Sequence, residues 1–325
     1  MSKFSNLGNK LYSGEKSFNF TGRRGIWYTI SAIVIAVSAV LPFTLHNGFN
    51  FGIEFKGGSE FSITGGAAKG TALAVETLKT ELPNEEPQVT TVGTDTVRVQ
   101  TSQLSDSKSE AVRVALAKSY SVDSSAVSSS FIGASWGQDI TFKALNGLVW
   151  FLALAAILMA LYFRTVKMSI AAMAALLHDL LITSGIYGSF GFEVTPAAVI
   201  GFLTILGYSL YDTVVVFDKI RENTEEVEHS ETATFTERVN LAINQTLVRS
   251  INTTVVAVLP VAAILFIGAY VFGAGTLRDI SLALFIGMLV GTYSTLFIAA
   301  PLYAQLREKE SKFAVAAAKV LAKRQ

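Results

Sequence analysis

The stretch INTTVVAVLPVAAILFIGAYVF, residues 251–272, contains no charged side chain. An α-helix advances 1.5 Å per residue, so about 20 apolar residues cover the hydrocarbon core of a bilayer. This segment has the length and the composition of a transmembrane helix. It predicts that the chain is an integral membrane protein.

Five further segments have the same character. They are residues 26–45, 145–163, 168–190, 196–217 and 280–303. The whole 325-residue chain is 51% hydrophobic and 16% charged, whereas soluble domains carry roughly 25% charged residues. The first segment is longer than the roughly 7–15 apolar residues of a signal peptide, so we expect it to be a retained anchor. The sequence predicts a polytopic α-helical membrane protein with six transmembrane helices.

Lysine and arginine in short loops resist translocation and therefore report orientation. Basic residues lie in the amino-terminal arm 1–25, in the connection at Arg164 and Lys167, and in the tail 305–325, whereas the connection around Glu193 has none. We expect both termini and the amphipathic segment 218–250 to be cytoplasmic. Residues 46–143 are then extracytoplasmic.

This external segment has the pattern of a small α+β domain. The strands are predicted at Glu60–Thr64, Gln88–Val92, Val97–Thr101 and Val127–Ile132. Helices are predicted at Thr71–Leu82 and after Ser105, which is expected to cap the second one. The order βαββαβ is the ferredoxin-like pattern. No residue in it suggests catalysis, so we interpret it as a binding or mechanical module.

The string NFGIEFKGGSEF, residues 50–61, precedes the first strand of this domain. Gly57 and Gly58 stand between two short β-type runs and permit a turn or bulge with unusual backbone angles. A simple linker turn is the equally plain alternative.

Charge inside a membrane is expensive, so a retained ionisable group is a functional hypothesis. Asp212 lies six residues, roughly 9 Å, inside the charged end of its segment. Tyr208 lies one turn earlier on the same face and is positioned to hydrogen-bond it. We interpret Asp212 as a site for a proton or an ion; helix packing through a hydroxyl group is the alternative.

Two other groups have open interpretations. Asp179 follows His178 near the middle of the third segment, where helix packing and proton relay are equally plausible. Arg249 precedes the fifth segment and is either an interfacial anchor or a counter-ion for Asp212. We expect no metal site, because these groups supply too few ligands. Gly287 and Gly291 form a stripe of small residues that predicts close helix packing in the sixth segment.

Four motifs carry a resemblance to a known family. They are GIEFKGG (52–58), GYSLYDTVVVFDKIREN (207–223), AINQTLVRSINTT (242–254) and GMLVGTYSTLFIAAP (287–301). With the six-helix layout and the external domain, the chain resembles the SecF family, the smaller subunit of the bacterial SecD–SecF protein-export complex in the resistance–nodulation–division superfamily. Members of that family usually have Asp at Glu54, Asn at Tyr211 and Arg at Lys219.

The resemblance implies several expectations. Asp212 and Arg249 match positions of the family's transmembrane proton pathway. We expect Tyr208 and, less directly, Asp179 to belong to the same pathway. Residues Gly52, Glu54, Phe55, Gly57 and Gly58 match a family motif. The implied partners are SecD, the SecYEG channel, a YajC-like small subunit and the preprotein substrate, in the bacterial cytoplasmic membrane.

The implied function is non-enzymatic and needs no cofactor or metal: the proton motive force promotes preprotein translocation across the membrane and protein insertion into it. A half-size proton-coupled exporter of lipids or small molecules and a purely structural membrane subunit are the alternatives. A net charge of +1 provides no field for nucleic acid. The absence of cysteine excludes disulfides and thiolate chemistry.

Overall fold

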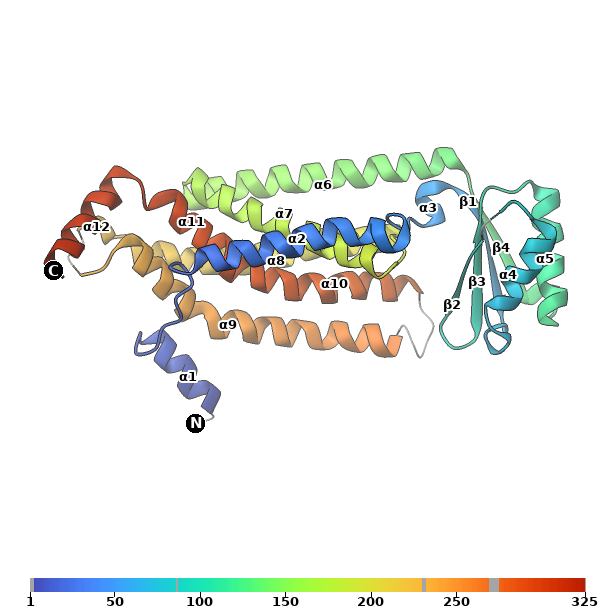
Figure 1. Ribbon diagram of the computed structural model, residues 1–325, viewed down its shortest axis with the longest axis horizontal. Coiled ribbons are helices and arrows are strands. Elements are labelled where there is room, and N and C mark those ends of the chain that lie inside the picture. The colour runs from blue at the N-terminus through green and yellow to red at the C-terminus, as the bar shows by residue number, and fades with distance from the viewer. Residues whose placement is uncertain (1–2, 86, 230–231, 269–274, 325) are drawn as a thin grey trace.

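The computed structural model describes residues 3–85, 87–229, 232–268 and 275–324. Within those ranges, six helices are long and apolar enough to cross a membrane. They run side by side along the long axis of the molecule, with a small sheet domain at one end and both chain termini at the other (Figure 1). The chain is a multi-pass membrane protein with the predicted fold class.

The six helices are longer than the apolar segments that predicted them. They are α2 (Arg24–His46), α6 (Ala134–Phe163), α7 (Val166–Ser189), α8 (Pro196–Thr224), α9 (Phe235–Ala263, continued by a π-helical turn at Ile264–Gly268) and α10 (Gly275–Ser294, continued by a π-helical turn at Thr295–Ala299 and by α11 at Ala300–Arg307). The last residues of the predicted segment 251–272 lie outside the described residues. Two amphipathic helices, α1 (Lys3–Tyr12) and α12 (Ser311–Lys323), flank the bundle near the termini.

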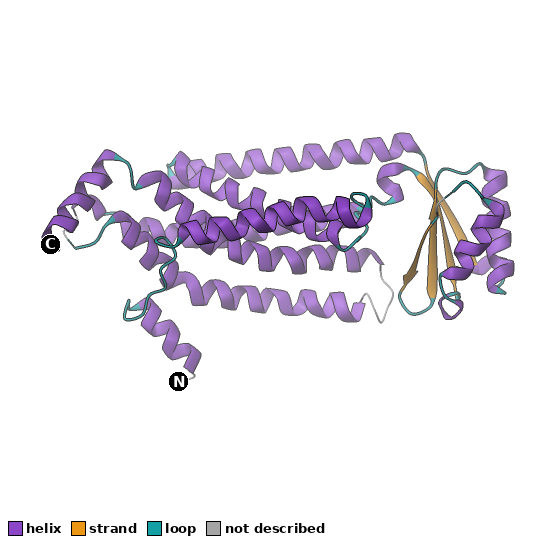
Figure 2. Cartoon of the chain, viewed as in Figure 1, coloured by secondary structure: helices purple, strands orange, loops and turns teal. Residues whose placement is uncertain are grey.

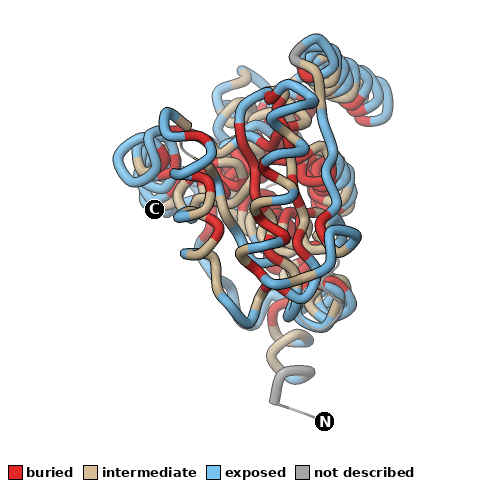
Figure 3. Tube along the Cα trace, turned by 90° about the vertical axis from the view of Figure 1, so that its right-hand side faces the viewer, coloured by how far each residue is buried: buried red, intermediate tan, exposed pale blue. Residues whose placement is uncertain are grey.

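Three of these helices form the interior of the bundle. About half of the most apolar window of α7, α8 and α10 is buried, whereas α2, α6 and α9 are largely exposed on their outer faces. An end-on view, with the sheet domain nearest the viewer, shows exposed segments around the outside of the molecule (Figure 3). Because lipid is as apolar as leucine, the exposed faces are what a membrane-embedded surface requires.

The segment 218–250 contains the end of one long helix and the beginning of the next. Helix α8 extends into this segment as far as Thr224. Helix α9 begins at Phe235 with a capping box, in which the side chains of Thr234 and Glu237 each accept a hydrogen bond from the other's backbone amide. Helix α9 then continues without interruption into the membrane. Hydropathy locates only the apolar part of such a helix, since the helix extends beyond the hydrocarbon.

The sheet domain has the predicted order of elements, β1 (Gly58–Thr64), α4 (Ala72–Glu81), β2 (Gln88–Val92), β3 (Thr96–Thr101), α5 (Asp106–Tyr120) and β4 (Val127–Ile132). The strands are antiparallel in the spatial order β2-β3-β1-β4, which is the ferredoxin-like arrangement (Figure 2). Ser105 occupies the N-cap position of α5 but makes no capping hydrogen bond; its hydroxyl contacts that of Ser107.

The two faces of the sheet differ in chemistry. Apolar side chains of one face, including Phe61, Ile63, Val97 and Val99, pack against Leu78 and Leu116 of the two helices. The opposite face carries polar residues such as Glu60, Arg98 and Gln100 and is turned toward the helix bundle (Figure 1). The alternation of the strands therefore places a polar surface at the outer end of the bundle.

Candidate functional site: a polar interior in the bundle

Asp212 lies in the interior of the bundle on α8. Its side chain is 7% exposed, and its Oδ1 accepts a hydrogen bond of 2.8 Å from Ser250 Oγ of α9. Its Oδ2 is buried and has no hydrogen-bond partner among the described residues. A buried carboxylate oxygen without a partner is costly.

Among the described residues, neither Arg249 nor Tyr208 is hydrogen-bonded to Asp212, although the charge of Arg249 acts on its carboxyl group. Arg249 is exposed, and no ion pair joins it to Asp212 among the described residues. Neighbouring residues of a helix point about 100° apart, so α9 directs Ser250 inward and Arg249 outward. The hydroxyl of Tyr208 interacts with Thr254 of α9, and its ring packs near Val261. The hydroxyl group that contacts Asp212 is that of Ser250.

Asp179 of α7 belongs to a second group of polar side chains in the bundle interior. It is fully buried, and Ser209 Oγ of α8 donates to its Oδ2 at 2.6 Å. His178 Nδ1 lies 3.2 Å from Asp179 Oδ1, and His178 Nε2 lies 3.2 Å from Ser31 Oγ of α2. The two neighbouring side chains therefore contact each other. The contacts continue to Tyr293, whose hydroxyl lies 3.2 Å from Ser31 Oγ and donates to the Trp27 carbonyl oxygen at 3.4 Å.

Two pairs of threonine hydroxyl groups connect α8 and α9 with α10 and the π-helical turn that continues it. Thr254 and Thr292 are 2.5 Å apart, and Thr213 and Thr295 are 2.9 Å apart, measured between Oγ1 atoms. Sequence reasoning did not select Ser31, Ser209 or Ser250, which complete the two carboxylate sites. One signal was available: Ser209 lies one helical turn from Asp212.

The glycines of α10 allow this close arrangement. A Cβ atom on Gly287 would lie 2.4 Å from Ile205 Cγ1 of α8, and one on Gly291 would lie 3.0 Å from Ser209 Cβ. Gly291 thereby leaves room for the hydrogen bond between Ser209 and Asp179. The helices α8 and α10 approach each other within this chain.

The motif around Gly57 forms the connection between bundle and sheet. Residues Ile53–Lys56 form one helical turn, α3, where a β-type run was expected. Gly57 and Gly58 then have φ angles of 76° and 151°, and a Cβ on Gly58 would lie 2.5 Å from the Thr101 carbonyl oxygen. The predicted unusual backbone is present, and it starts strand β1. Gly52 N donates to the Val194 carbonyl at 3.0 Å, which attaches the motif to the α7–α8 loop.

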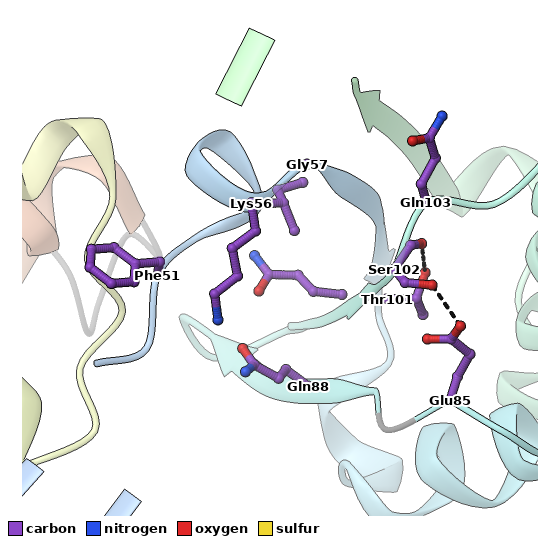
Figure 4. A pocket seen from close by; sticks show the side chains of 10 residues that line it. Phe51, Lys56, Gly57, Glu85, Gln88, Thr101, Ser102 and Gln103 are labelled. Atoms are coloured by element: carbon purple, nitrogen blue, oxygen red, sulfur yellow. Dashed lines mark hydrogen bonds between the residues drawn. The ribbon is translucent and has the colours of Figure 1, made fainter. Parts of the chain in front are cut away.

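Glu54 of this motif is partly buried. Burial raises the pKa of its carboxyl group, and a hydrogen bond with its own backbone lowers it. The nearby Glu193 and Glu60 raise the pKa further, and Arg98 opposes them. A cavity of about 460 Å³ lies beside the motif, between Phe51 and Lys56 on one side and Gln88 and Ser102 of the sheet domain on the other (Figure 4). Among the described residues no group of three or more His, Asp or Glu side chains is arranged to hold a metal ion.

Comparison with known proteins gives the family. The sequence profile described as "Protein export membrane protein SecD/SecF, C-terminal" matches residues 112–309, and that described as "SecD/SecF GG Motif" matches residues 43–65. The chain belongs to the SecD/SecF family. The GG motif of that family therefore includes α3 and the two glycines with positive φ. The polar interior, apart from Ser31 of α2, lies within the part matched by the C-terminal profile.

Two relatives named SecF match along most of their length, whereas a relative named SecDF matches along less than half of its own. The chain is 45% identical to "Protein translocase subunit SecF" of Streptomyces coelicolor, over all of this chain and 86% of the relative. It is 41% identical to the protein of the same name from Mycobacterium tuberculosis H37Rv, over 93% of this chain and 70% of the relative. It is 31% identical to "Protein translocase subunit SecDF" of Thermus thermophilus, over 89% of this chain but 38% of that longer relative.

Solved structures of the family share the fold. The crystal structure of SecDF, described as a translocon-associated membrane protein from Thermus, superposes with a TM-score of 0.76 at 28% identity, covering 90% of this chain and 39% of that one. A second SecDF structure, in a form called Super-membrane-facing, gives a TM-score of 0.61 at 27% identity, covering 94% of this chain and 40% of that one. The chain thus spans about two fifths of each SecDF chain.

Proposed function

We propose that this chain is the SecF-type accessory subunit of the Sec protein translocase, which uses the proton motive force to promote preprotein translocation and membrane-protein insertion. The observation that carries the proposal is the match of the complete chain to a relative named as a protein translocase subunit. A buried, half-satisfied carboxyl group in the bundle supports the proton-coupled part. No enzymatic activity is needed for this role.

The proposed setting is the bacterial cytoplasmic membrane. The distribution of lysine and arginine supports cytoplasmic termini and an external sheet domain. The SecDF relative, which joins a similar region to a longer chain, supports SecD as the direct partner. SecYEG, a YajC-like small subunit and the preprotein complete the proposed assembly.

The proposed proton step takes place at Asp212. In the conformation described here, Asp212 contacts Ser250 while Arg249 points outward, which is the arrangement expected for the neutral acid. Ionisation creates a charge that needs a cation, and Arg249 is the basic residue next to the contacting serine. A rotation or shift of α9 that brings Arg249 inward would displace α8 and α10 as well, because the same hydroxyl pairs connect them.

Purification of the tagged full chain in a mild detergent tests the assembly. We expect SecD and the translocation channel to be recovered with it, and vesicles depleted of the chain to lose gradient-stimulated preprotein translocation. Recovery of the chain alone, with unchanged translocation by the depleted vesicles, would favour the half-size exporter. Recovery of the complex with translocation insensitive to the gradient would favour a purely structural subunit.

A further inference from the structure

Five side chains meet where the polar face of the sheet approaches the outer end of the bundle, and we call them the carboxylate clamp. They are Glu54 of α3, Glu60 of β1, Arg98 and Gln100 of β3, and Glu193 of the α7–α8 loop. The sheet domain and the bundle are thus connected by side chains as well as by the two chain segments that join them.

Gln100 and Arg98 bridge the two parts. Gln100 Nε2 donates to Glu60 Oε2 at 3.0 Å and to Glu193 Oε1 at 2.8 Å. Arg98 lies 3.7 Å from Glu60 and 3.5 Å from Glu193, measured between nitrogen and oxygen. These are long distances for charge-assisted hydrogen bonds, which are about 2.7–2.9 Å. The side chain of Glu193 is 9% exposed, so its contacts are sheltered from water.

The carboxylate clamp contains more acidic side chains than basic ones. It combines three carboxyl groups with one guanidinium group, and the Glu54 Oε2 and Arg98 Nε atoms are buried without hydrogen-bond partners. The Cβ position of Gly52 lies 2.4 Å from Glu54 Oε2 and 3.0 Å from Glu193 Oε1, so both carboxyl groups crowd the same backbone. Like charges this close disfavour full ionisation.

Other charged groups border the clamp without entering it. Lys56 of α3 and Glu85 line the cavity on one side, and Arg278 lines the cavity on the other side and pairs with Asp279. His46 contacts the Ser189 carbonyl oxygen. Asp139 and Lys143 lie on exposed positions of α6, and no ion pair joins either of them to the clamp within the described ranges. The balance inside the clamp is therefore set by its own five members.

We propose that the carboxylate clamp is a proton-sensitive latch, separate from Asp212, that holds the sheet domain against the bundle while Glu54 is neutral and releases it when Glu54 ionises. The two connecting segments contain glycine at the junctions with the sheet, Gly57-Gly58 at the start of β1 and Gly133 after β4. The backbone contacts of Gly52 and Val194 keep α3 on the bundle during release. The sheet is the part that moves.

The direction of the pH effect follows from the raised pKa of Glu54. The closed form holds the proton more tightly than an ordinary glutamate, whose pKa is 4.5. Closure is therefore fully favoured below that value and weakens as the pH rises from it through the raised pKa of the closed form. An acidic external medium closes the latch.

Release changes the shape of the outer surface. Gln100 lines both the cavity of about 460 Å³ beside α3 (Figure 4) and a second cavity of about 490 Å³ lined by Phe190, Phe192 and Arg278. Gln88 lines both cavities as well, and Gln100 is the lining residue that also contacts Glu60 and Glu193. When these contacts break, the two cavities join into one groove beneath the polar face of the sheet.

A distance measurement tests the latch without any transport assay. Because the chain has no cysteine, cysteines at Ser107 of α5 and Thr276 of α10 give a unique spin-labelled pair on exposed positions. We expect the full chain in lipid nanodiscs to show one short distance at pH 4.5 and a longer, broader population that grows several-fold by pH 8. The E54Q variant should keep the short distance throughout, and the E76Q variant, which changes an exposed carboxyl of α4, should follow the wild type.

Two outcomes would overturn the proposal. One is a wild-type distance that does not depend on pH over this range; the other is an E54Q variant that titrates like the wild type. If E54Q does not fold, the E54D variant replaces it, and it must retain a pH-dependent distance with a shifted midpoint. A chain that transports normally but fails these tests would leave the proposed function intact and eliminate the latch.

Discussion

The environment of Asp212 depends on one hydroxyl group. Ser250 donates to Oδ1, while Oδ2 has no partner among the described residues. If the neutral acid is the resting form, this hydrogen bond fixes the orientation of the carboxyl group between two proton transfers. Ser250 is then a positioning residue for the proton step.

The S250A variant should therefore lose both stability and coupling. Leaving a buried polar group without its partner costs about 1–3 kcal/mol, and the carboxyl group becomes free to rotate. We expect a lower melting temperature and a reduced gradient-dependent stimulation of translocation. The matched control is S184A, because Ser184 is half-buried and, among the described residues, its hydroxyl donates only to a carbonyl of its own helix; loss of stimulation in S184A, or full stimulation in S250A, would contradict the assignment.

The two aspartates could be found from sequence because a charge in an apolar span is rare, whereas their serine partners could not. Serine is common in transmembrane helices, and its partner is decided by the rotation of one helix against another, which no local pattern encodes. The same reason explains the difference at Arg249, whose outward direction follows from the position of Ser250. The proton-pathway assignment of these residues stays a prediction.

At the scale of helices, contact between α8 and α10 depends on glycine. The Cβ positions calculated for Gly287 and Gly291 fall within 3.0 Å of α8 side chains. Backbones that approach this closely gain dispersion contacts and allow the buried hydroxyl groups to meet. The small-residue stripe thus has a geometric consequence inside this chain.

The G287A variant should destabilise the bundle. Its methyl group meets Ile205, and overpacking of this kind costs about 1–3 kcal/mol. On α8, Gly207 has no atom within 4 Å of its Cβ position, so G207A should be neutral or stabilising by up to about 1 kcal/mol. Thermal unfolding of both purified variants checks this; equal melting temperatures for G287A and wild type would show that the helices separate easily.

The order of elements was predictable from periodicity, but their ends were not. The strands Gln88–Val92 and Val127–Ile132 have the predicted bounds because turn residues and β-type runs flank them clearly. Helix α6 begins at Ala134, whereas the apolar segment begins at 145. Helical hydrogen bonding continues through polar residues outside the hydrocarbon, and hydropathy cannot detect it.

At the scale of the whole molecule, the sheet domain has its own core. Residues such as Phe61, Val99, Leu116 and Tyr120 are buried among themselves, and every strand is paired within the domain. We expect residues 58–132 to fold without the bundle. The latch described above then joins two independently stable parts.

The isolated domain gives a direct test. Its amide NMR spectrum should be well dispersed, and L116A should destabilise it by about 2–5 kcal/mol through the cavity it leaves. Val114 lies on the same helix, but its side chain is half-exposed. The effect of V114A on the free energy of unfolding should therefore be several-fold smaller. A poorly dispersed spectrum, or equal effects of the two variants, would show that the bundle is needed for folding.

The central claim, that proton movement through Asp212 drives the export function, is tested most directly by D212N. Asparagine mimics the neutral acid permanently at nearly the same size. In sealed vesicles, the assembled complex should retain basal preprotein translocation and lose its stimulation by a proton gradient. R249M should behave alike, R249K should keep part of the stimulation, and D179N should have a milder effect. Full gradient-dependent stimulation in a well-assembled D212N complex would contradict the account.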